Sequence, residues 1–275
     1  MKEYMAVRMK PALAVYNELK GKVTFLYHKL KLFTYENTTG RTLALSISET
    51  ITLALYKQTQ NIQTKYAIWK DFQPSCSYKT LVVNMNRRAL LAVFVRLHIL
   101  KMNRLNAHIV KHTDSTDIPV CLNKNAKSHK TMQGLAAWGH SGKGHYYGLK
   151  LHLTSDLDRQ LLAIRFSPAN THGTRIFTKL NEDLEGIFVA DAEFISETLQ
   201  RDFYREHRRI LFARPRKNMK KLITAFQYHL YNTRMRIELN FRNLKMFYGL
   251  LTSLPRSING YLANYFYSIL AYALS

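Results

Sequence analysis

Four polar residues near the C-terminus have a spacing that could do chemistry. Intervals of three, four and seven residues separate Tyr231, Arg234, Glu238 and Lys245. On a helix, at about 100° per residue, these side chains fall in one narrow sector. The adjacent sector is apolar and is expected to face the core; it contains Leu222, Phe226, Leu230, Ile237, Phe241 and Leu244. A single carboxylate among cations, beside a buried face, suggests a helix that brings a metal-binding acid to an anionic substrate.

Two aspartates earlier in the chain could join Glu238. Residues 107–114 are a β-rich run that ends in Asp114, and residues 186–191 are a compact apolar run that ends in Asp191. Three carboxylates brought together would suit phosphodiester transfer, in which two Mg²⁺ ions, or Mn²⁺ in their place, activate the nucleophile and hold the leaving oxygen. Asp114, Asp191 and Glu238 are therefore the predicted catalytic and metal-binding residues, with Asp114 bridging both ions.

Each aspartate also has a simpler interpretation and a competitor. An aspartate at the end of a strand often only forms a turn or caps a helix. Asp117 could take the place of Asp114, and Glu193 could take the place of Asp191. We favour Asp114 and Asp191 because they fall, together with the acid on the helix, at compatible places in one order of elements.

Basic and aromatic side chains near these acids are predicted to bind an extended anion. Arg234 and Lys245 would grip phosphates on either side of the reacting bond, and Tyr231 would hydrogen-bond a phosphate or stack on a base. Glu238 could instead form a surface ion pair with Arg234 or Arg242. Further candidates for DNA binding are Arg242, Lys143, Trp138 and the run from Arg201 to Lys221, which has nine basic and two acidic residues.

The elements that must position these residues alternate between strands and helices. We expect strands at residues 107–114, 145–154, 160–167, 186–191 and 209–214. Helices are expected at 174–184 and 195–207, before the long helix that ends near Gly249. The second and third of these form a hairpin, and residues 122–144 are expected to be a long basic loop. Within that loop Trp138 could stack on a base, although an anchor for the loop is the simpler role. The order is that of a ribonuclease H-like core, a mixed sheet flanked by helices.

Residues 1–108 are expected to form a separate helical domain, and residues 109–275 the catalytic domain. Apolar residues recur at helical spacing in four segments, at 12–19, 43–56, 63–69 and 89–100. Several short basic helices are typical of a helix-turn-helix-like DNA-binding module, whose recognition helix would lie within residues 77–88. A helical bundle that only packs on the next domain explains the pattern equally well. A final aromatic helix is expected at about 258–274.

The chain is strongly basic throughout. It has 41 lysines and arginines against 18 aspartates and glutamates, a net charge of +23. Residues 1–108 carry +12 of this excess and residues 109–275 carry +11. Charge spread over folded segments suggests a long polyanion that lies across the whole molecule. Nucleic acid is the first candidate, an anionic membrane surface the second, and ribosomal or chromatin-like packing the third.

Cysteine usage and the apolar runs favour the cytoplasm. The two cysteines, Cys76 and Cys121, have neither zinc-site spacing nor a disulfide framework, as in a reducing compartment. The N-terminus has charges too early for a signal peptide. The longest apolar run, residues 261–274, is shorter than the roughly 20 residues of a membrane span, so we expect it to form a buried helix.

The spacing Tyr-x2-Arg-x3-Glu-x6-Lys resembles the signature of the last catalytic helix in the DDE transposases of bacterial insertion sequences. From about residue 40 onward, the chain resembles those members that have a compact, uninterrupted catalytic core. The other matching segments are His112-Thr-Asp114-Ser115, Tyr147-Gly-Leu-Lys-Leu-His152 and Val189-Ala-Asp191.

This resemblance implies a ribonuclease H-like fold and a full reaction cycle on DNA. The enzyme would recognise the terminal inverted repeats of its element, cut the DNA at those ends, and let the freed 3′ hydroxyl attack target DNA. Homodimers or larger assemblies would bring the two ends together, in the bacterial cytoplasm on the nucleoid. A nuclease on the same fold without strand transfer, or an inactive DNA-binding relic, are the alternatives.

The chain departs from the family pattern in two places. Members usually have Gly-Asp-x-Gly-Tyr around the second acid, whereas this chain has Ala190-Asp191-Ala-Glu-Phe194. Only 46 residues separate Asp191 from Glu238. That interval leaves no room for the large insertion that some relatives carry there, so a DNA-hairpin intermediate is less supported.

Overall fold

The computed structural model describes residues 12–36, 44–207, 209–215, 219 and 222–275. The chain divides into two compact units. The first contains Met1–Leu97, Leu244–Leu250 and Leu254–Ser275, and the second contains His98–Asn243 and Leu251–Ser253. This division differs from the expected boundary near residue 108, because the C-terminal segment belongs with the N-terminal helices. Two helices, α5 (Tyr78–Leu105) and α9 (Met235–Phe247), each contribute residues to both units.

The described part of the first unit is helical. Besides most of α5, it contains α2 (Ala12–Lys29), η2 (Leu32–Tyr35), α3 (Ile47–Thr59), α4 (Lys65–Phe72) and α10 (Ile258–Ala273). These helices overlap the four expected segments, although Leu43 lies outside the described residues. No helix in the described ranges is both long and apolar enough to cross a membrane.

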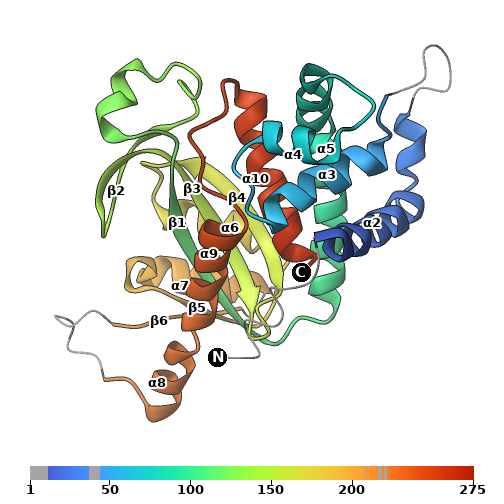
Figure 1. The fold of residues 1–275 in the computed structure, drawn as a ribbon. Helices are drawn as coiled ribbons and strands as arrows, with labels where there is room; N and C mark the ends of the chain where they lie inside the picture. The colour runs from blue at the N-terminus through green and yellow to red at the C-terminus, as the bar shows by residue number, and fades with distance from the viewer. Residues whose placement is uncertain (1–11, 37–43, 208, 216–218, 220–221) are drawn as a thin grey trace, which may run out of the picture. The chain divides into compact units, whose positions relative to one another are not determined.

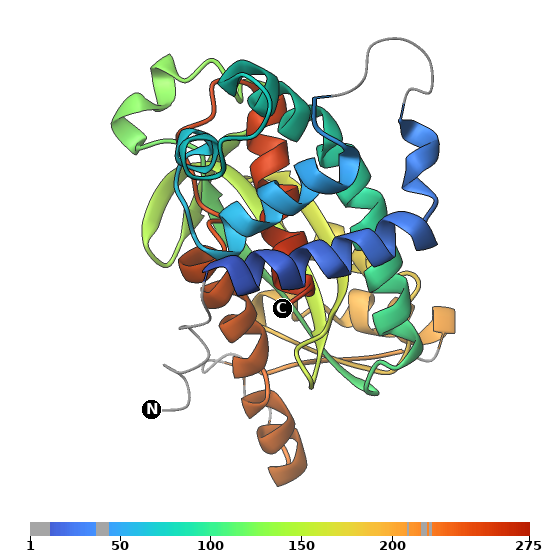
Figure 2. The same ribbon diagram turned by 45° about the vertical axis from the view of Figure 1, so that its right-hand side comes forward.

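Polar contacts join α10 to the helices that precede it by about 200 residues in the chain. Gln58 on α3 donates a hydrogen bond to Oδ1 of Asn264 at 2.8 Å. Tyr267 donates its hydroxyl proton to the carbonyl of Met85 on α5 at 3.0 Å. Figure 2 shows α10, in red, beside α3. These bonds connect buried groups and explain why α10 belongs to the first unit.

The second unit is built on a six-stranded mixed sheet (Figure 1). Its strands are β1 (Val110–Pro119), β2 (Ala137–Ser141), β3 (Gly144–Asp156), β4 (Leu161–Pro168), β5 (Ile187–Ala190) and β6 (Ile210–Ala213). The order is β2-β3-β1-β5-β6, and β4 also pairs with β3. β3 is antiparallel to β1, β2 and β4, whereas β5 runs parallel to β1 and β6 parallel to β5.

An aromatic cluster holds the parallel strands against their helices. Phe188 on β5 packs edge-on against Phe203 of α7 (Glu197–His207), with ring centroids 5.0 Å apart. Phe177 of α6 (Gly173–Leu180) lies 5.5 Å from Phe194 of η4 (Ala192–Phe194). All four rings are at most 1% exposed. Burial of rings on this scale dominates a core, so the position at which β5 ends is firmly set.

Two expectations about the strands were wrong. The first strand was expected to end at Asp114, but β1 continues to Pro119 because β3 supplies a pairing partner as far as Gly148. Residues 122–144 were expected to be a single loop, but β2 forms within them and pairs with residues 144–148 of β3. The same stretch also contains η3 (Asn123–Ser128). The turn from β2 into β3 ends at Gly144, whose φ of 103° favours glycine.

The long C-terminal helix is broken in two. α8 (Ala225–Asn232) begins with a capping box at Thr224, and α9 follows after a turn at residues 233–234. The hydroxyl of Thr233 donates to the carbonyl of Leu230 at 2.7 Å and holds that turn. The expected apolar face is correct for α9, where Ile237, Phe241 and Leu244 are buried. It is wrong before the turn, where Phe226 of α8 and Leu222, which precedes α8, are exposed, because the turn separates the two faces.

Candidate active site

Strand register brings the two aspartates to the same level of the sheet. β1 and β5 run parallel, with Val110 opposite Ile187 and His112 opposite Val189. Two residues further along each strand are Asp114 and Asp191. β5 ends at Ala190, so Asp191 follows its carboxyl end, while Asp114 lies in the middle of β1 and not at its end as expected. The two acids are therefore neighbours because the parallel partner of β1 stops there.

One arginine draws all three predicted acids together. The Nη2 atom of Arg234 donates to Oδ2 of Asp114 at 2.6 Å and lies 3.7 Å from Oδ2 of Asp191. The Nη1 atom donates to Oε1 of Glu238, four residues along the chain, at 2.7 Å. Glu238 therefore forms the ion pair with Arg234 that was the alternative interpretation. It also lies with the other two acids around the same guanidinium.

The remaining oxygen of each aspartate is fixed by the backbone next to it. Oδ1 of Asp114 accepts the N–H of Ser115 at 2.8 Å, and Oδ1 of Asp191 accepts the N–H of Ala192 at 2.6 Å. Asp191 thereby caps η4 with a φ of −74°, and neither Ala190 nor Glu193, which stand at the two glycine positions of the pattern, has a positive φ. The turn in this chain consequently does not need the glycines of the usual family pattern.

Burial gives the site one shielded and one open side. The Asp114 and Arg234 side chains are 12% and 14% exposed, whereas Asp191 and Glu238 are 44% and 56% exposed. Burial raises the pKa of Asp114 to about 6; Arg234 and the Ser115 N–H oppose this shift, and the nearby charges of Asp191 and Glu193 add to it. Burial lowers the pKa of Arg234, but the surrounding carboxylates outweigh it and the net shift is upward.

A buried histidine ties the first acid's strand to the helix turn. Nε2 of His112 lies 2.7 Å from the hydroxyl of Thr233, whose proton goes to the carbonyl of Leu230. The hydroxyl therefore accepts, and the His112 proton is on Nε2. Burial lowers the pKa of His112 to about 4, so the ring is neutral near pH 7. Sequence reasoning placed His112 in a motif without assigning it this positioning role.

The donor set suits a hard divalent cation. Asp114, Asp191 and Glu238 each turn one oxygen toward the place filled by the guanidinium, and such cations prefer carboxylate oxygens. With the side chains as they stand, no three His, Cys, Asp or Glu side chains of the described ranges are grouped around a metal-sized space. The three acids are the residues that would hold metal.

Comparison with known families decides the identity. A family model described as "Transposase DDE domain" matches residues 105–257, more than half of the chain. The chain belongs to this family of DDE transposases. The match includes all three acids of the cluster. No curated protein matches this transposase.

A comparison with solved structures finds a piggyBac transposase synaptic complex with hairpin DNA, studied by cryo-electron microscopy. The sequence identity is 9% and the TM-score is 0.47. The similarity covers 98% of this transposase and 76% of that chain.

Arg214 is a cation at the same edge of the sheet that sequence reasoning did not single out within the basic run. It follows Ala213, which pairs with Ala190, so Arg214 is level with Asp191 across the parallel strands. Its guanidinium lies 5.3 Å from the ring centroid of Tyr231 and 5.9 Å from that of Tyr228. The signal that could have found it is its position directly after a strand, in phase with the second acid. Residues 208, 216–218 and 220–221 of the run lie outside the described residues.

The other predicted residues are spread more widely. Arg242 is exposed on α9, and Lys245 lies further along that helix, in the part that belongs to the first unit. Trp138 on β2 is 48% exposed and its ring contacts that of Tyr147 at 5.8 Å, while Lys143 is in the exposed turn between β2 and β3. No contact between the acids and either Trp138 or Lys143 appears among the described residues.

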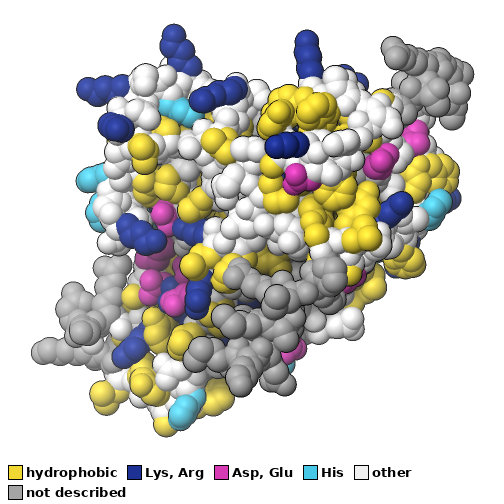
Figure 3. All heavy atoms as spheres, viewed as in Figure 1, with side chains coloured by type: hydrophobic (Ala, Val, Ile, Leu, Met, Phe, Trp, Pro, Cys, Tyr) yellow, Lys and Arg dark blue, Asp and Glu magenta, His cyan; other side chains and the backbone are white. Residues whose placement is uncertain are grey.

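The two competing acids have different positions. Asp117 follows Asp114 by three residues on β1, so its side chain points to the opposite face of the sheet. Glu193 lies in η4, close enough that its charge raises the pKa of Asp114. Figure 3 shows acidic side chains gathered beside the position of α9, with basic side chains around them.

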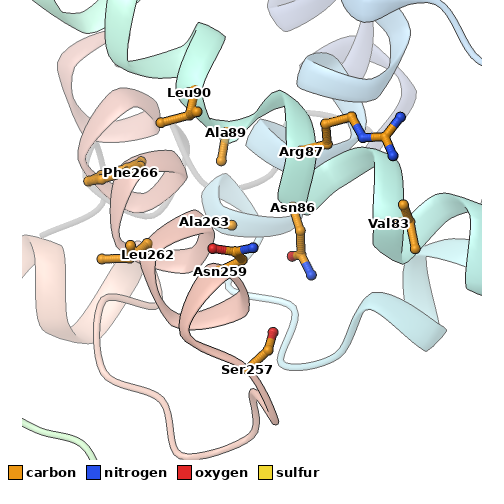
Figure 4. A pocket seen from close by; sticks show the side chains of 10 residues that line it. All are labelled: Val83, Asn86, Arg87, Ala89, Leu90, Ser257, Asn259, Leu262, Ala263 and Phe266. Carbon is orange, nitrogen blue, oxygen red and sulfur yellow. The ribbon is translucent and has the colours of Figure 1, made fainter. Parts of the chain in front are cut away.

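Two cavities lie away from the acid cluster. One of about 450 Å³ lies within the first unit between α5 and α10, with Asn86 and Asn259 toward its middle and Leu90 and Phe266 at one end (Figure 4). The other, of about 520 Å³, lies in the second unit beside β6 and α8. Neither cavity is lined by an aspartate or glutamate.

Proposed function

We propose that this transposase binds the terminal inverted repeats of its own insertion sequence, cuts the DNA at those ends, and joins the 3′ ends to target DNA. The observation that carries the proposal is the convergence of Asp114, Asp191 and Glu238 on one position. The sheet supports it as well. Apart from β2, the antiparallel strands β1, β3 and β4 are followed by β5 and β6, which run parallel to β1, and this is the order expected of a ribonuclease H-like core.

Asp114, Asp191 and Glu238 would hold two Mg²⁺ ions, or Mn²⁺ in their place. Bound metal supplies activation of the attacking oxygen and charge stabilisation of the leaving oxygen. The chain itself contributes a shielded side, where Asp114 is buried against the sheet. It also contributes an open side, from which DNA would approach Asp191 and Glu238.

Cations and aromatic rings around the acids would position the DNA backbone. Arg242 and Lys245 on α9 would bind phosphates by charge-assisted hydrogen bonds. Tyr231, with Arg214 against its ring, offers a face on which an unpaired base can stack. Lys143 and Trp138, at the turn of β2 and β3, are candidates for contacts farther from the cut.

The first unit would recognise the repeat sequence. The expected recognition segment, residues 77–88, forms the beginning of α5, where Tyr78 and Val83 are 41% and 43% exposed. Exposed side chains at the start of a helix are those that contact base edges in a helix-turn-helix module. Two copies of the chain would hold the two ends together, on the nucleoid in the bacterial cytoplasm.

Cleavage and joining of a DNA fragment with the flanking repeats tests this function. The wild-type chain with Mg²⁺ or Mn²⁺ should cut at the repeat edge and join that end to a second DNA. Glu238→Gln should lower both rates by on the order of 10³-fold, while Glu182→Gln, an exposed acid outside the cluster, should leave both unchanged. Cutting without repeats or joining would instead indicate a nuclease. Binding of the ends without cutting would indicate an inactive relic.

A further inference from the structure

The guanidinium of Arg234 occupies the position on which the acids converge. It reaches Asp114 and Glu238 through hydrogen bonds of 2.6 and 2.7 Å, and Asp191 across 3.7 Å. Its planar fork has donors on both nitrogen ends, so one side chain can serve several carboxylates at once. The Arg234 side chain is also largely buried, so water competes little with the carboxylates for its N–H groups.

Charge explains why a cation is needed there. Three ionised carboxylates against one arginine leave two negative charges in excess, and Glu193 adds to the field at Asp114. Carboxylates this close repel one another unless a cation lies between them. Removing the partner of a buried carboxylate strongly destabilises the folded protein. Arg234 therefore holds together acids that would otherwise separate.

The same oxygens would have to bind metal. The Oδ1 atoms of Asp114 and Asp191 already accept backbone N–H groups, so Oδ2 of each is the atom that remains for a ligand. Those Oδ2 atoms, and Oε1 of Glu238, are the ones that Arg234 contacts. A guanidinium and a metal ion cannot occupy one position. We propose that Arg234 is a built-in counter-ion of the acid cluster, which the entering metal displaces toward the DNA.

The fold allows this exchange without moving a helix. The backbone of Arg234 is held by its N–H to the carbonyl of Tyr231 at 3.0 Å, and the adjacent Thr233 is bound to His112. The side chain alone has to swing, toward the open side where Asp191 and Glu238 lie. Once released, the guanidinium becomes free to bind a DNA phosphate. The inference rests on the proposed function in one respect, namely that these acids bind metal.

Binding of Mn²⁺ to the DNA-free protein, measured by calorimetry, tests the competition. Arg234→Gln should bind Mn²⁺ at least about tenfold more tightly than the wild type, because no cation has to leave. In EDTA this variant should melt at a lower temperature, and Mn²⁺ should restore it. Arg242→Gln makes the same charge change on α9 and should alter the affinity less than twofold. Unchanged or weaker affinity in Arg234→Gln, or equal tightening in both variants, overturns the proposal.

Modification of arginines by phenylglyoxal tests the wild-type chain directly. Arg234 should be protected in EDTA and become reactive when Mn²⁺ saturates the protein, whereas exposed Arg242 should react in both conditions. Protection that persists at saturation overturns the proposal even if Arg234→Gln does not fold. A protein that shows the exchange but fails to cut repeat DNA contradicts the proposed function and leaves this inference standing. Absence of Mn²⁺ binding in wild type and variant contradicts both.

Discussion

At the scale of single residues, buried histidines in the sheet link protonation to folding. His152 on β3 is 2% exposed, and its Nε2 lies 2.9 Å from the hydroxyl of Ser167. Burial, with the charges of Lys150 and Arg165, lowers its pKa to about 4 from the ordinary 6.5. The unfolded chain therefore takes up this proton at a higher pH than the folded chain does.

The free energy of unfolding should fall as the pH drops from 6.5 to 4. Between these values the unfolded state binds more protons, so His152 contributes stability above the window and loses about 3 kcal/mol across it. His152→Gln keeps a hydrogen-bonding group near Ser167 and removes the titration. Urea unfolding at both ends of the window should show a smaller loss in this variant.

Exposed His145 supplies the control for this prediction. Across the same pH window, His145→Gln should lose as much stability as the wild type, because it leaves His152 and the carboxylates elsewhere in the chain unchanged. If His152→Gln also loses as much as the wild type, the assigned proton linkage is wrong.

At the scale of elements, Asp114 in the middle of β1 lies level with Asp191 and Arg214, which directly follow the carboxyl ends of β5 and β6. Parallel strands in this register form a row of side chains that no single element could supply. The last member of the row meets α8, whose Tyr228 and Tyr231 rings both lie within 6 Å of the guanidinium. Cation and rings together form a surface that fits both a phosphate and a base.

Arg214→Gln should weaken binding of a duplex with a single-stranded flank by roughly three- to tenfold. It removes a phosphate contact and frees the two rings that it orders. Fluorescence anisotropy with labelled DNA measures the affinity. Arg165→Gln makes the same charge change at an exposed position of β4 and should weaken binding less. If the two variants weakened DNA binding equally, Arg214 would contribute only its charge and no specific contact.

Local sequence pattern predicted most elements but not where they end. The apolar run before Asp191 forms β5 because its own residues suit a buried strand. Residues 115–119 are mostly polar, and they continue β1 only because β3 pairs with them. Thr233 and Arg234 fit a continuous helix, but the turn there is bound to His112, 121 residues earlier in the chain.

The candidate site shows the same division. Its three acids could be predicted from spacing and from their places after apolar runs. The position of Arg234 between them could not, because its partner Asp114 is 120 residues away and the contact depends on the final packing. The sequence predicted phosphate contacts for Arg234 and, as an alternative, an ion pair with Glu238; the structure contains that ion pair and adds the contacts with Asp114 and Asp191.

At the scale of the whole molecule, the chain carries a net charge of +23 although its candidate site is built from acids. The excess is spread over both halves of the chain, which suits contact with several phosphates at once. Release of counter-ions from DNA then makes affinity depend steeply on salt.

Affinity for DNA should fall by at least about 10³-fold between 50 and 200 mM salt, as expected when six or more phosphates are neutralised. Anisotropy titrations across a salt series measure the slope of log K against log salt. An uncharged-polymer buffer of equal osmolarity controls for effects of solutes in general. A slope near zero would show that the charge serves some purpose other than binding DNA.

The grouping of α10 with the N-terminal helices has a consequence for biosynthesis. A ribosome releases the chain from its N-terminus onward, and domains usually fold in that order. Here the sheet and its acids are complete once α9 has emerged, whereas the first unit must wait for residues 258–273 to cover α3 and α5. The unit that begins first is finished last, so a nascent chain assembles the acid cluster before the unit that is proposed to recognise the repeat sequence.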